Sequence, residues 1–251
     1  MKKRIVFVLN NLQYADGVAK VLVELCNFLD EKLFDITIIP IYRCDSNFIK
    51  LLKPYIHIQK TLGFYFRGLD KIVNALPIRF LYQKIVGGNY DIEVAFQYGL
   101  ATRMIANSTN HNAKHYAWMH GYDEGLTLGK EYPKFDKVFC VSKFNEERLR
   151  RESNGTVNVD CCYNIIDESK ILEASKDEIS EDTSQKPIFV AVGRQTPEKG
   201  FLRLVDVVSR LKKDGYHFTL WLIGDGAEHQ QLVDKVSGEK LEDSVKLLGI
   251  Q

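Results

Sequence analysis

The sequence has no excess of charge of either sign. Its 251 residues include 34 lysines and arginines and 33 aspartates and glutamates, which gives a formal net charge of +1. No global field therefore attracts nucleic acid, and we expect no nucleic-acid partner. The cysteines show no metal-ligand spacing, so we expect no metal site and interpret all five as buried, reduced thiols: Cys26, Cys44, Cys140, Cys161 and Cys162.

Long apolar runs are also missing. The N-terminal segment MKKRIVFVLNNLQ begins with basic residues, as a signal peptide does, but its apolar run stops after five residues. It is too short for a signal peptide, and no small-residue cleavage site follows. Nothing elsewhere approaches the roughly twenty apolar residues of a membrane span. The sequence therefore predicts a globular, cytoplasmic chain.

Short β-rich runs alternate with helical patterns along the chain. After an apolar run at residues 4–9, apolar residues recur from Val18 to Leu29 with the spacing of one helix face. Near-continuous apolar strands separated by helices are typical of a parallel sheet that is covered on both faces. The strands expected after the first are residues 35–41, 55–58, 92–96, 115–119, 137–142 and 159–163.

The composition changes after Asn164. Residues 167–187 are acidic, polar and poor in large apolar side chains, as interdomain connections often are. A second alternation follows, with strands at 188–192, 218–223 and 245–248 and helices at 201–213 and 227–236. We therefore expect an α/β protein with two Rossmann-like units built on parallel sheets, the second incomplete. The expected divisions are an N-terminal, acceptor-side domain at 1–165, a linker at 166–187 and a partial nucleotide-sugar-binding domain at 188–251.

The stretch FVAVGRQTPEKGF changes character where the first strand of the second unit ends. Gly193 allows a tight turn, and Gly200 lies near the start of a helix whose N–H groups favour an anion. Arg194 and Lys199 add two positive charges at this point, and an arginine can hold phosphate oxygens in a bidentate fork. A diphosphate would fit this arrangement. An alternative stays open, in which Lys199 is a solvated loop residue and Arg194 pairs with Glu198.

Residues 190–249 closely resemble the second domain of retaining GT-B glycosyltransferases of the group-one family, called family four. The motif G-R-x-x-x-E-K-G lies at Gly193 to Gly200, and G-D-G follows at Gly224 to Gly226. The first unit resembles the family's N-terminal domain more loosely, through DGVAKVLVELCNFL, WMHG, VFCVSKFNEERL and YNIID.

This resemblance implies transfer of a sugar from a UDP- or GDP-sugar donor with retention at the anomeric carbon, and no further cofactor. In the family, the matching arginine and lysine stabilise the diphosphate as it leaves, which suits the charge that develops there. The family's glycine pair reads Asp16-Gly17 here, and a packed histidine in a turn stays an alternative for His120. The implied catalytic residues are His120, Arg194 and Lys199, and the implied donor-binding residues are Gly17, Gly193, Arg194, Lys199 and Gly224.

The family's settings imply a saccharide or lipid-linked acceptor in the synthesis of capsule, O-antigen or another bacterial surface polysaccharide. The family's downstream E-x7-E motif is not present, so we expect a chain truncated within the second domain, with the nucleobase near Ile250 and Gln251. A non-catalytic or split subunit that needs a completing polypeptide is the alternative. A dinucleotide-binding enzyme is a weaker one, because GDGAEH supplies only two of the three glycines of G-x-G-x-x-G.

Two surfaces follow from the sequence. Residues 64–86 interleave aromatic and aliphatic residues with Arg67, Lys71, Arg79 and Lys84. Such a segment can lie on an anionic membrane, at the inner face, although a helix packed on the sheet with a solvated basic side explains the pattern at least as well. An incomplete second sheet leaves an unpaired edge and uncovered apolar faces, so we expect this chain to self-associate and to be poorly active alone.

Overall fold

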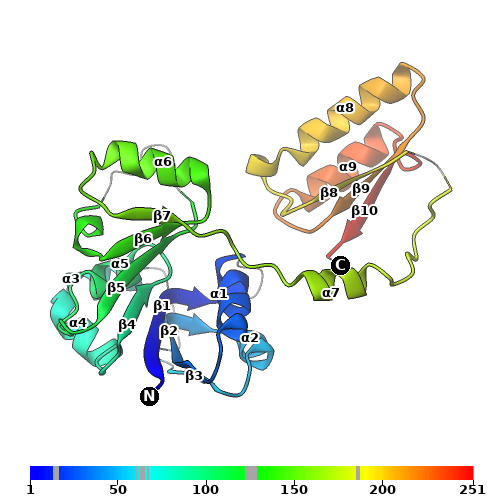
Figure 1. Cartoon of the computed structure of the whole chain (residues 1–251). Helices are drawn as coiled ribbons and strands as arrows, with labels where there is room; N and C mark the ends of the chain where they lie inside the picture. The colour runs from blue at the N-terminus through cyan, green and yellow to red at the C-terminus, as the bar shows by residue number, and fades with distance from the viewer. Residues whose placement is uncertain are drawn as a thin grey trace. The chain divides into compact units, whose positions relative to one another are not determined.

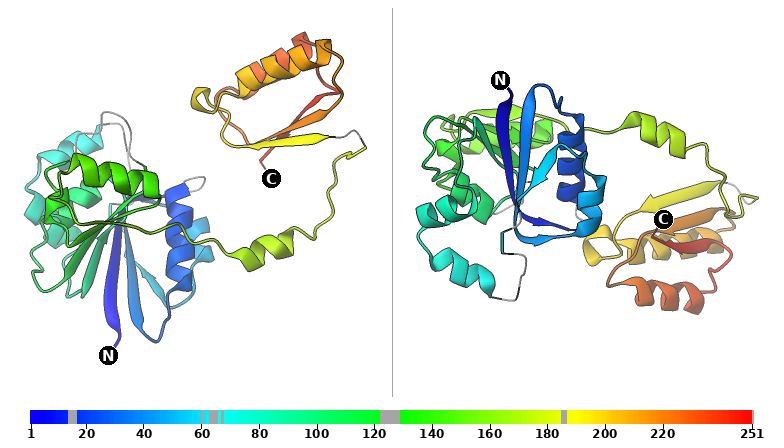
Figure 2. Two further views of the ribbon diagram at one scale, coloured as in Figure 1. Left: turned by 45° about the horizontal axis from the view of Figure 1, so that its top comes forward. Right: turned by 90° about the horizontal axis from the view of Figure 1, so that it is seen from below.

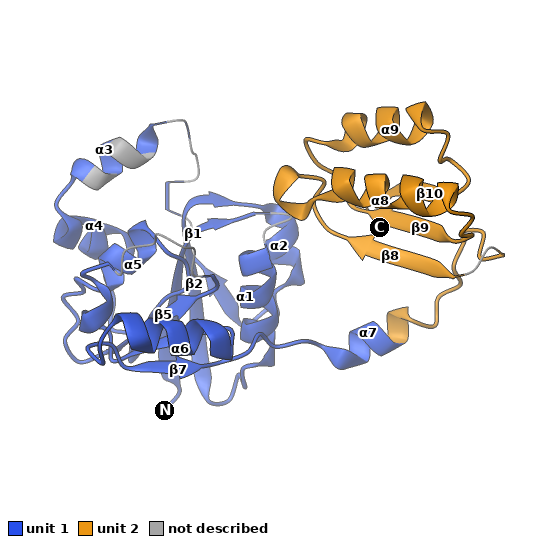
Figure 3. Ribbon diagram, turned by 90° about the horizontal axis from the view of Figure 1, so that it is seen from above, with its two compact units in different colours: residues 1–172 blue, residues 173–251 orange. Residues whose placement is uncertain are grey.

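The computed structural model describes two compact units. The residues described are 1–13, 17–59, 61–62, 66, 68–121, 129–184 and 187–250, with residues 70, 71 and 74 described by their backbone alone. Unit 1 comprises residues 1–172 and unit 2 comprises residues 173–251 (Figure 3). The division falls within the short helix α7 (Glu168–Ala174), in the acidic stretch that the sequence marks as a connection. Each unit is described by itself below.

Unit 1 is built on a seven-stranded sheet in the order β3-β2-β1-β4-β5-β6-β7. Every neighbouring pair is parallel, which confirms the fold class expected from the apolar runs. The strands are β1 (Lys3–Leu12), β2 (Phe34–Cys44), β3 (Ile56–Ile58), β4 (Ile92–Ala95), β5 (Lys114–Met119), β6 (Lys137–Cys140) and β7 (Val159–Cys161). The helices are α1 (Gly17–Phe28), α2 (Ser46–Leu51), α3 (Leu69–Ala75), α4 (Ile78–Ile85), α5 (Leu100–Ile105) and α6 (Lys143–Glu152).

Both faces of this sheet are buried, because successive side chains of a strand point to opposite faces. Val6 and Val8 of β1 belong to one hydrophobic core, which also contains residues of α3, α4, α5 and α6. Ile5 and Phe7 belong to a second core on the opposite face, which also contains residues of α1 and α2. Figures 1 and 2 show the helices in these two layers. Cys26 of α1 is fully buried, and burial raises the pKa of its thiol well above the ordinary value. Cys140 is buried as well, but Cys44, Cys161 and Cys162 are partly exposed, so the prediction that all five cysteines are buried is wrong for these three.

A buried carboxylate lies at the amino-terminal edge of this sheet. Glu93 of β4 is fully buried, and its Oε1 accepts hydrogen bonds from the Tyr82 hydroxyl at 2.6 Å and from Asn110 Nδ2 at 3.1 Å. His115 Nε2 lies 3.4 Å from its Oε2. Burial alone would raise the pKa of Glu93, but hydrogen bonds from His115, Tyr82, Ser108 and Asn110 hold that pKa below its ordinary value.

We expect Tyr82→Phe to lower the stability of unit 1 by about 1–3 kcal/mol near neutral pH, because it removes a donor from a buried carboxylate. A carboxylate whose pKa is lowered on folding contributes stability above its unfolded-state pKa, and this contribution is lost as the pH falls through the folded-state pKa. The cost of the substitution should therefore shrink in acid. Urea denaturation at about pH 7 and at about pH 2.5, well below the ordinary pKa of a glutamate, measures the difference.

The matched control is Tyr55→Phe, which removes a hydrogen bond to the backbone carbonyl of Leu29 and not to a carboxylate. Its cost should be the same at both pH values. An equal cost for Tyr82→Phe at both pH values would contradict the role assigned to Glu93.

Unit 2 has a three-stranded parallel sheet in the order β10-β9-β8. The strands are β8 (Ile188–Val192), β9 (Thr219–Ile223) and β10 (Val245–Gly249), and the helices are α8 (Phe201–Lys213) and α9 (His229–Gly238). Alternate residues of the strands pack with both helices in a single core on one face (Figure 2). The opposite face carries Val190 beside Trp221 in register, together with Val192, which is 72% exposed. The expected self-association stays a prediction, and it would depend on this face.

Within the described part of the chain, no helix has the length and apolar character that crossing a membrane requires.

Candidate functional site

The carboxyl ends of the three strands in unit 2 meet in one set of turns. Gly193, directly after β8, donates its N–H to Ile223 O of β9 at 3.0 Å, and Gly224, directly after β9, donates to Gly249 O of β10 at 2.6 Å. Small residues at three adjacent strand ends bring the backbones close together. This is the edge of a parallel sheet at which ligands bind.

Gly224 is the residue that this arrangement constrains most. Its φ is +126°, in a region that residues with a side chain rarely adopt, and a Cβ here would collide with the carbonyl oxygen of Gly193. The turn after β8 can therefore lie directly against the turn after β9 only if position 224 is glycine. The G-D-G pattern marks this position in the sequence, and the structure shows the contact that requires a glycine there. The donor-binding role of Gly224 stays a prediction.

The turn between β8 and α8 presents backbone and charge together. A short 3₁₀ segment (Pro197–Lys199) leads to Gly200, whose φ of +69° places it in the left-handed region at the N-terminus of α8. No described side chain caps this end of the helix. The first N–H groups of α8 therefore lack an intrahelical partner, and an anion can take that place.

Arg194 and Glu198 form the ion pair that the sequence left open as an alternative. Arg194 Nη2 lies 3.3 Å from Glu198 Oε1, and both side chains are more than half exposed, at 69% and 56%. Hydrogen bonds from its own backbone N–H and from Thr196, with the charges of Arg194 and Lys199, lower the pKa of Glu198. An exposed pair of this kind is worth about 0–1 kcal/mol. A diphosphate, with more charge and two oxygens for the guanidinium, can compete for Arg194.

Lys199 lies on the same turn and is exposed. Its aliphatic stem passes beside Gly193, where the methylene carbons lie 3.9 Å from the position a Cβ would take. Among the described residues, none forms an ion pair with its ammonium group. The turn therefore offers one weakly paired and one unpaired positive charge next to the start of α8.

Gln195 is the residue of this site that the sequence analysis missed. It is fully buried, although Arg194 next to it in the chain is exposed, and its Nε2 donates to Gly224 O at 2.8 Å. Its Oε1 lies 2.7 Å from His229 Nδ1. Nothing near it in the sequence distinguishes it from a solvated turn residue, because all its partners lie about thirty residues further along the chain.

The remaining predicted residues lie in unit 1. His120 follows β5, and its Nε2 donates to Phe96 O at 3.0 Å while its ring packs edge-on against the Phe96 ring at 4.7 Å. A carbonyl only accepts, so Nε2 carries the proton. Gly17 is the first residue of α1, after the carboxyl end of β1, and Asp16 lies outside the described residues. Unit 2 thus brings four of the predicted residues together, namely Gly193, Arg194, Lys199 and Gly224, and unit 1 holds Gly17 and His120 at the ends of different strands.

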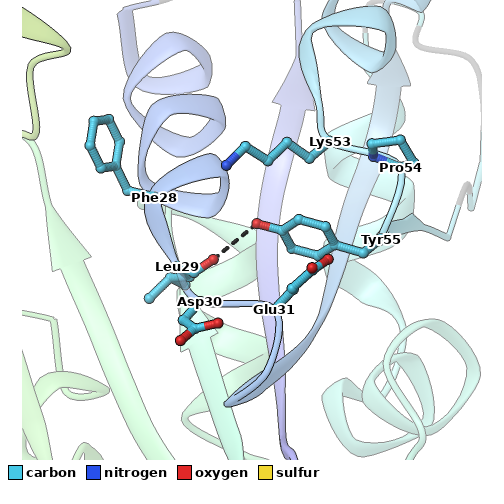
Figure 4. Close-up of a pocket in the computed structure, with 7 residues that line it drawn as sticks. All are labelled: Phe28, Leu29, Asp30, Glu31, Lys53, Pro54 and Tyr55. Carbon is cyan, nitrogen blue, oxygen red and sulfur yellow. Dashed lines mark hydrogen bonds between the residues drawn. The ribbon is translucent and has the colours of Figure 1, made fainter. Parts of the chain in front are cut away.

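A cavity of about 410 Å³ in unit 1 contains none of the predicted site residues. It lies between the end of α1 and the segment before β3, lined by Phe28, Leu29, Asp30, Glu31, Lys53, Pro54 and Tyr55 (Figure 4). These elements meet at the amino-terminal side of the sheet, opposite the strand ends at which parallel sheets bind ligands.

No group of three or more His, Cys, Asp or Glu side chains that could hold a metal ion occurs among the described residues.

The second unit matches a known family model. Residues 173–251 match the family model described as "Glycosyl transferases group 1". The match has the same limits as unit 2. One relative, the amylovoran biosynthesis glycosyltransferase AmsD of Erwinia amylovora, is 37% identical over 59 residues, which are 24% of this chain and 16% of that protein. The aligned part is thus a small fraction of the relative's own length.

Solved structures show the fold of the whole chain. A glycosyltransferase from Rickettsia africae matches with a TM-score of 0.65 and 19% identity, over 100% of this chain and 69% of that one. A mutant of S. aureus TarM in complex with fondaparinux, α-GlcNAc-glycerol and UDP matches with a TM-score of 0.68 and 11% identity, over 99% of this chain and 78% of that one. The chain has the α/β fold of GT-B glycosyltransferases, with parallel sheets, as the sequence predicts.

Proposed function

We propose that this protein transfers a sugar from a UDP- or GDP-sugar to a saccharide or lipid-linked acceptor, with retention at the anomeric carbon. The observation that carries the proposal is the turn after β8, which sets Arg194 and Lys199 beside the uncapped start of α8. The group-one family match over unit 2 supports it. No metal or further cofactor is part of the proposal.

In the proposed reaction, the bond between the anomeric carbon and the diphosphate oxygen breaks, and its electron pair stays on that oxygen. The acceptor hydroxyl oxygen forms the new glycosidic bond, and its proton passes to the departing diphosphate. Negative charge on the diphosphate therefore grows as the bond breaks. Arg194 and Lys199, with the N–H groups of α8, stabilise that growing charge. We assign His120 of unit 1 to the donor sugar.

A role in bacterial surface polysaccharide synthesis is part of the proposal. It is supported by the relative named for amylovoran biosynthesis, which aligns with this chain over 59 residues. The test is to incubate the protein with UDP- and GDP-sugars and candidate acceptors and to measure the nucleoside diphosphate released. NMR of the product then gives the anomeric configuration. An inverted product would reject retention, and tight donor binding without turnover on any acceptor would favour the non-catalytic alternative.

We further propose that the α3–α4 corner of unit 1 binds an anionic membrane surface. Residues 64–86 contain four basic residues and one acidic residue, a net charge of +3, whereas the whole chain carries +1. Phe64, Tyr65 and Arg67 lie outside the described residues. Among the described ones, Ile72 and Phe80 are 58% and 50% exposed, and Lys84 Nζ lies 6.0 Å from the centre of the Phe80 ring.

Aromatic and aliphatic side chains beside basic groups are the composition that favours the headgroup region of anionic bilayers. We expect the protein to float with liposomes that contain phosphatidylglycerol and not with neutral liposomes. A variant with glutamine at Arg67, Lys71, Arg79 and Lys84 should float several-fold less, since each basic group near the surface contributes about 1 kcal/mol.

The matched control places glutamine at four exposed lysines elsewhere in unit 1: Lys2, Lys3, Lys20 and Lys50. It should float like the unchanged protein. Equal flotation of the two variants, or no flotation of the unchanged protein, would reject the membrane role and leave the solvated helix face as the explanation.

A further inference from the structure

We infer that Gln195 is a positioning residue for the diphosphate, and this inference rests on the proposed function. Gln195 joins the turn that carries Arg194 and Lys199 to the turn after β9, through both its backbone and its side chain. It touches no donor itself. Its role is to hold the two basic residues in the arrangement that a diphosphate needs.

The backbone of Gln195 is bonded in both directions. Its N–H donates to Asp225 O at 2.9 Å, and its carbonyl accepts the N–H of Glu228 at 2.9 Å. The fit is tight, because a Cβ on Gly226 would collide with the carbonyl oxygen of Gln195. The backbone of Gln195 thus fixes the turn after β8 to the turn after β9, in addition to the close contact between Gly193 and Gly224.

The side-chain amide has its two ends fixed as well. Because Nε2 donates to the Gly224 carbonyl, Oε1 must accept, and His229 Nδ1 at 2.7 Å must carry a proton. His229 is the first residue of α9, so the amide connects the turn after β8 to the start of a packed helix. Gln195 is fully buried, so losing either partner would leave a polar atom without water.

Arg194 and Gln195 are consecutive residues of a tight turn, in which the N–H of Thr196 donates to Arg194 O at 3.0 Å. Gln195 points into unit 2 and is buried, while Arg194 next to it is exposed. Fixing the inward side chain therefore fixes the direction of the outward one. The need to orient Arg194 explains why a glutamine whose two amide atoms are both hydrogen-bonded is buried in this turn. A buried apolar residue would fill the same space without setting the orientation of the turn.

The substitution that tests this is Gln195→Met, which has a similar shape and no hydrogen-bonding groups. If the turn then spends about a tenth of its time in the competent arrangement, the Kd for UDP or GDP rises about tenfold. The Kd for the corresponding nucleoside monophosphate, which lacks the second phosphate, should rise less. A purely structural role would lower the melting temperature and weaken both ligands by the same factor.

Gln230→Met is the matched control, because Gln230 is exposed and, among the described residues, its side chain bonds to Asp234 alone, one turn further along α9. It should bind both nucleotides normally. If Gln195→Met does not fold, Gln195→Asn replaces it in the test, because it keeps the amide but shortens the side chain. It should also weaken the binding of the nucleoside diphosphate more than that of the monophosphate.

The outcomes separate this inference from the proposed function. Normal diphosphate binding by Gln195→Met, together with lost binding in Lys199→Ala, would overturn the inference and keep the function. Equal weakening of both nucleotides by Gln195→Met would also overturn it. Normal binding by Lys199→Ala, or no binding by the unchanged protein, would overturn the proposed function and the inference with it.

Discussion

Lys199→Ala is expected to weaken the binding of UDP or GDP by about tenfold or more, because a charge-assisted contact is worth about 1.5–3 kcal/mol. Turnover should fall further than binding, since the charge on the leaving diphosphate grows in the transition state. Folding should be unaffected, as Lys199 is exposed and has no ion-pair partner among the residues described. Calorimetry gives the binding loss, and the release of nucleoside diphosphate gives the turnover.

The matched control is Lys213→Ala, which removes an exposed lysine at the C-terminal end of α8, the helix whose N-terminus follows Lys199 and Gly200. It should leave both binding and turnover unchanged. If the two alanine variants behave alike, the charge at position 199 has no specific role.

Arg194→Lys separates the two explanations of the arginine. A lysine can keep an exposed ion pair with Glu198, but an ammonium group cannot reproduce the bidentate fork on a diphosphate. If the ion pair with Glu198 is the only role of Arg194, this variant should have unchanged turnover. If Arg194 holds phosphate oxygens, turnover should fall by about tenfold or more, and we expect this result.

Gly224→Ala is expected to destabilise unit 2 by about 3 kcal/mol or more, since it combines backbone strain with a direct collision. The φ of +126° is one that alanine rarely adopts, and the added Cβ would meet the carbonyl oxygen of Gly193. The turn after β9 would have to move away from the turn after β8, so donor binding should be lost as well.

Urea denaturation followed by tryptophan fluorescence reports on this variant, because Trp221 of β9 is largely buried in unit 2. The matched control is Gly238→Ala at the end of α9, where a Cβ meets nothing within 4 Å. It should be neutral or slightly stabilising. A Gly224→Ala protein as stable as the unchanged one would contradict the constraint described for this position.

The strands and the glycine turns could be predicted from the sequence because they depend on local rules. The apolar run within residues 4–9 is too short to cross a membrane and predicts a buried strand, and β1 (Lys3–Leu12) lies there. Gly193 and Gly224 were found because a strand that ends in glycine signals a tight turn. The contact between these two glycines was not predictable, since it depends on the order of the strands.

Gln195 and Glu198 show what the local rules leave out. The sequence could offer Glu198 as a partner of Arg194, since the two lie four residues apart, and the structure contains that pair. It could not indicate that Gln195 is buried, because its partners Gly224 and His229 are brought to it by the sheet. The orientation of His120 likewise depends on Phe96, which belongs to another strand end.

The central claim is that the turn from Gly193 to Gly200 binds the diphosphate of a nucleotide sugar. The most direct test is a titration of the isotope-labelled protein with UDP and with GDP, followed by the backbone amide resonances. The account predicts saturable shifts at Gly193, Lys199, Gly200 and Phe201 with one of the two nucleotides. Shifts confined to other sites, such as the cavity around Tyr55, or no shift with either nucleotide, would contradict it.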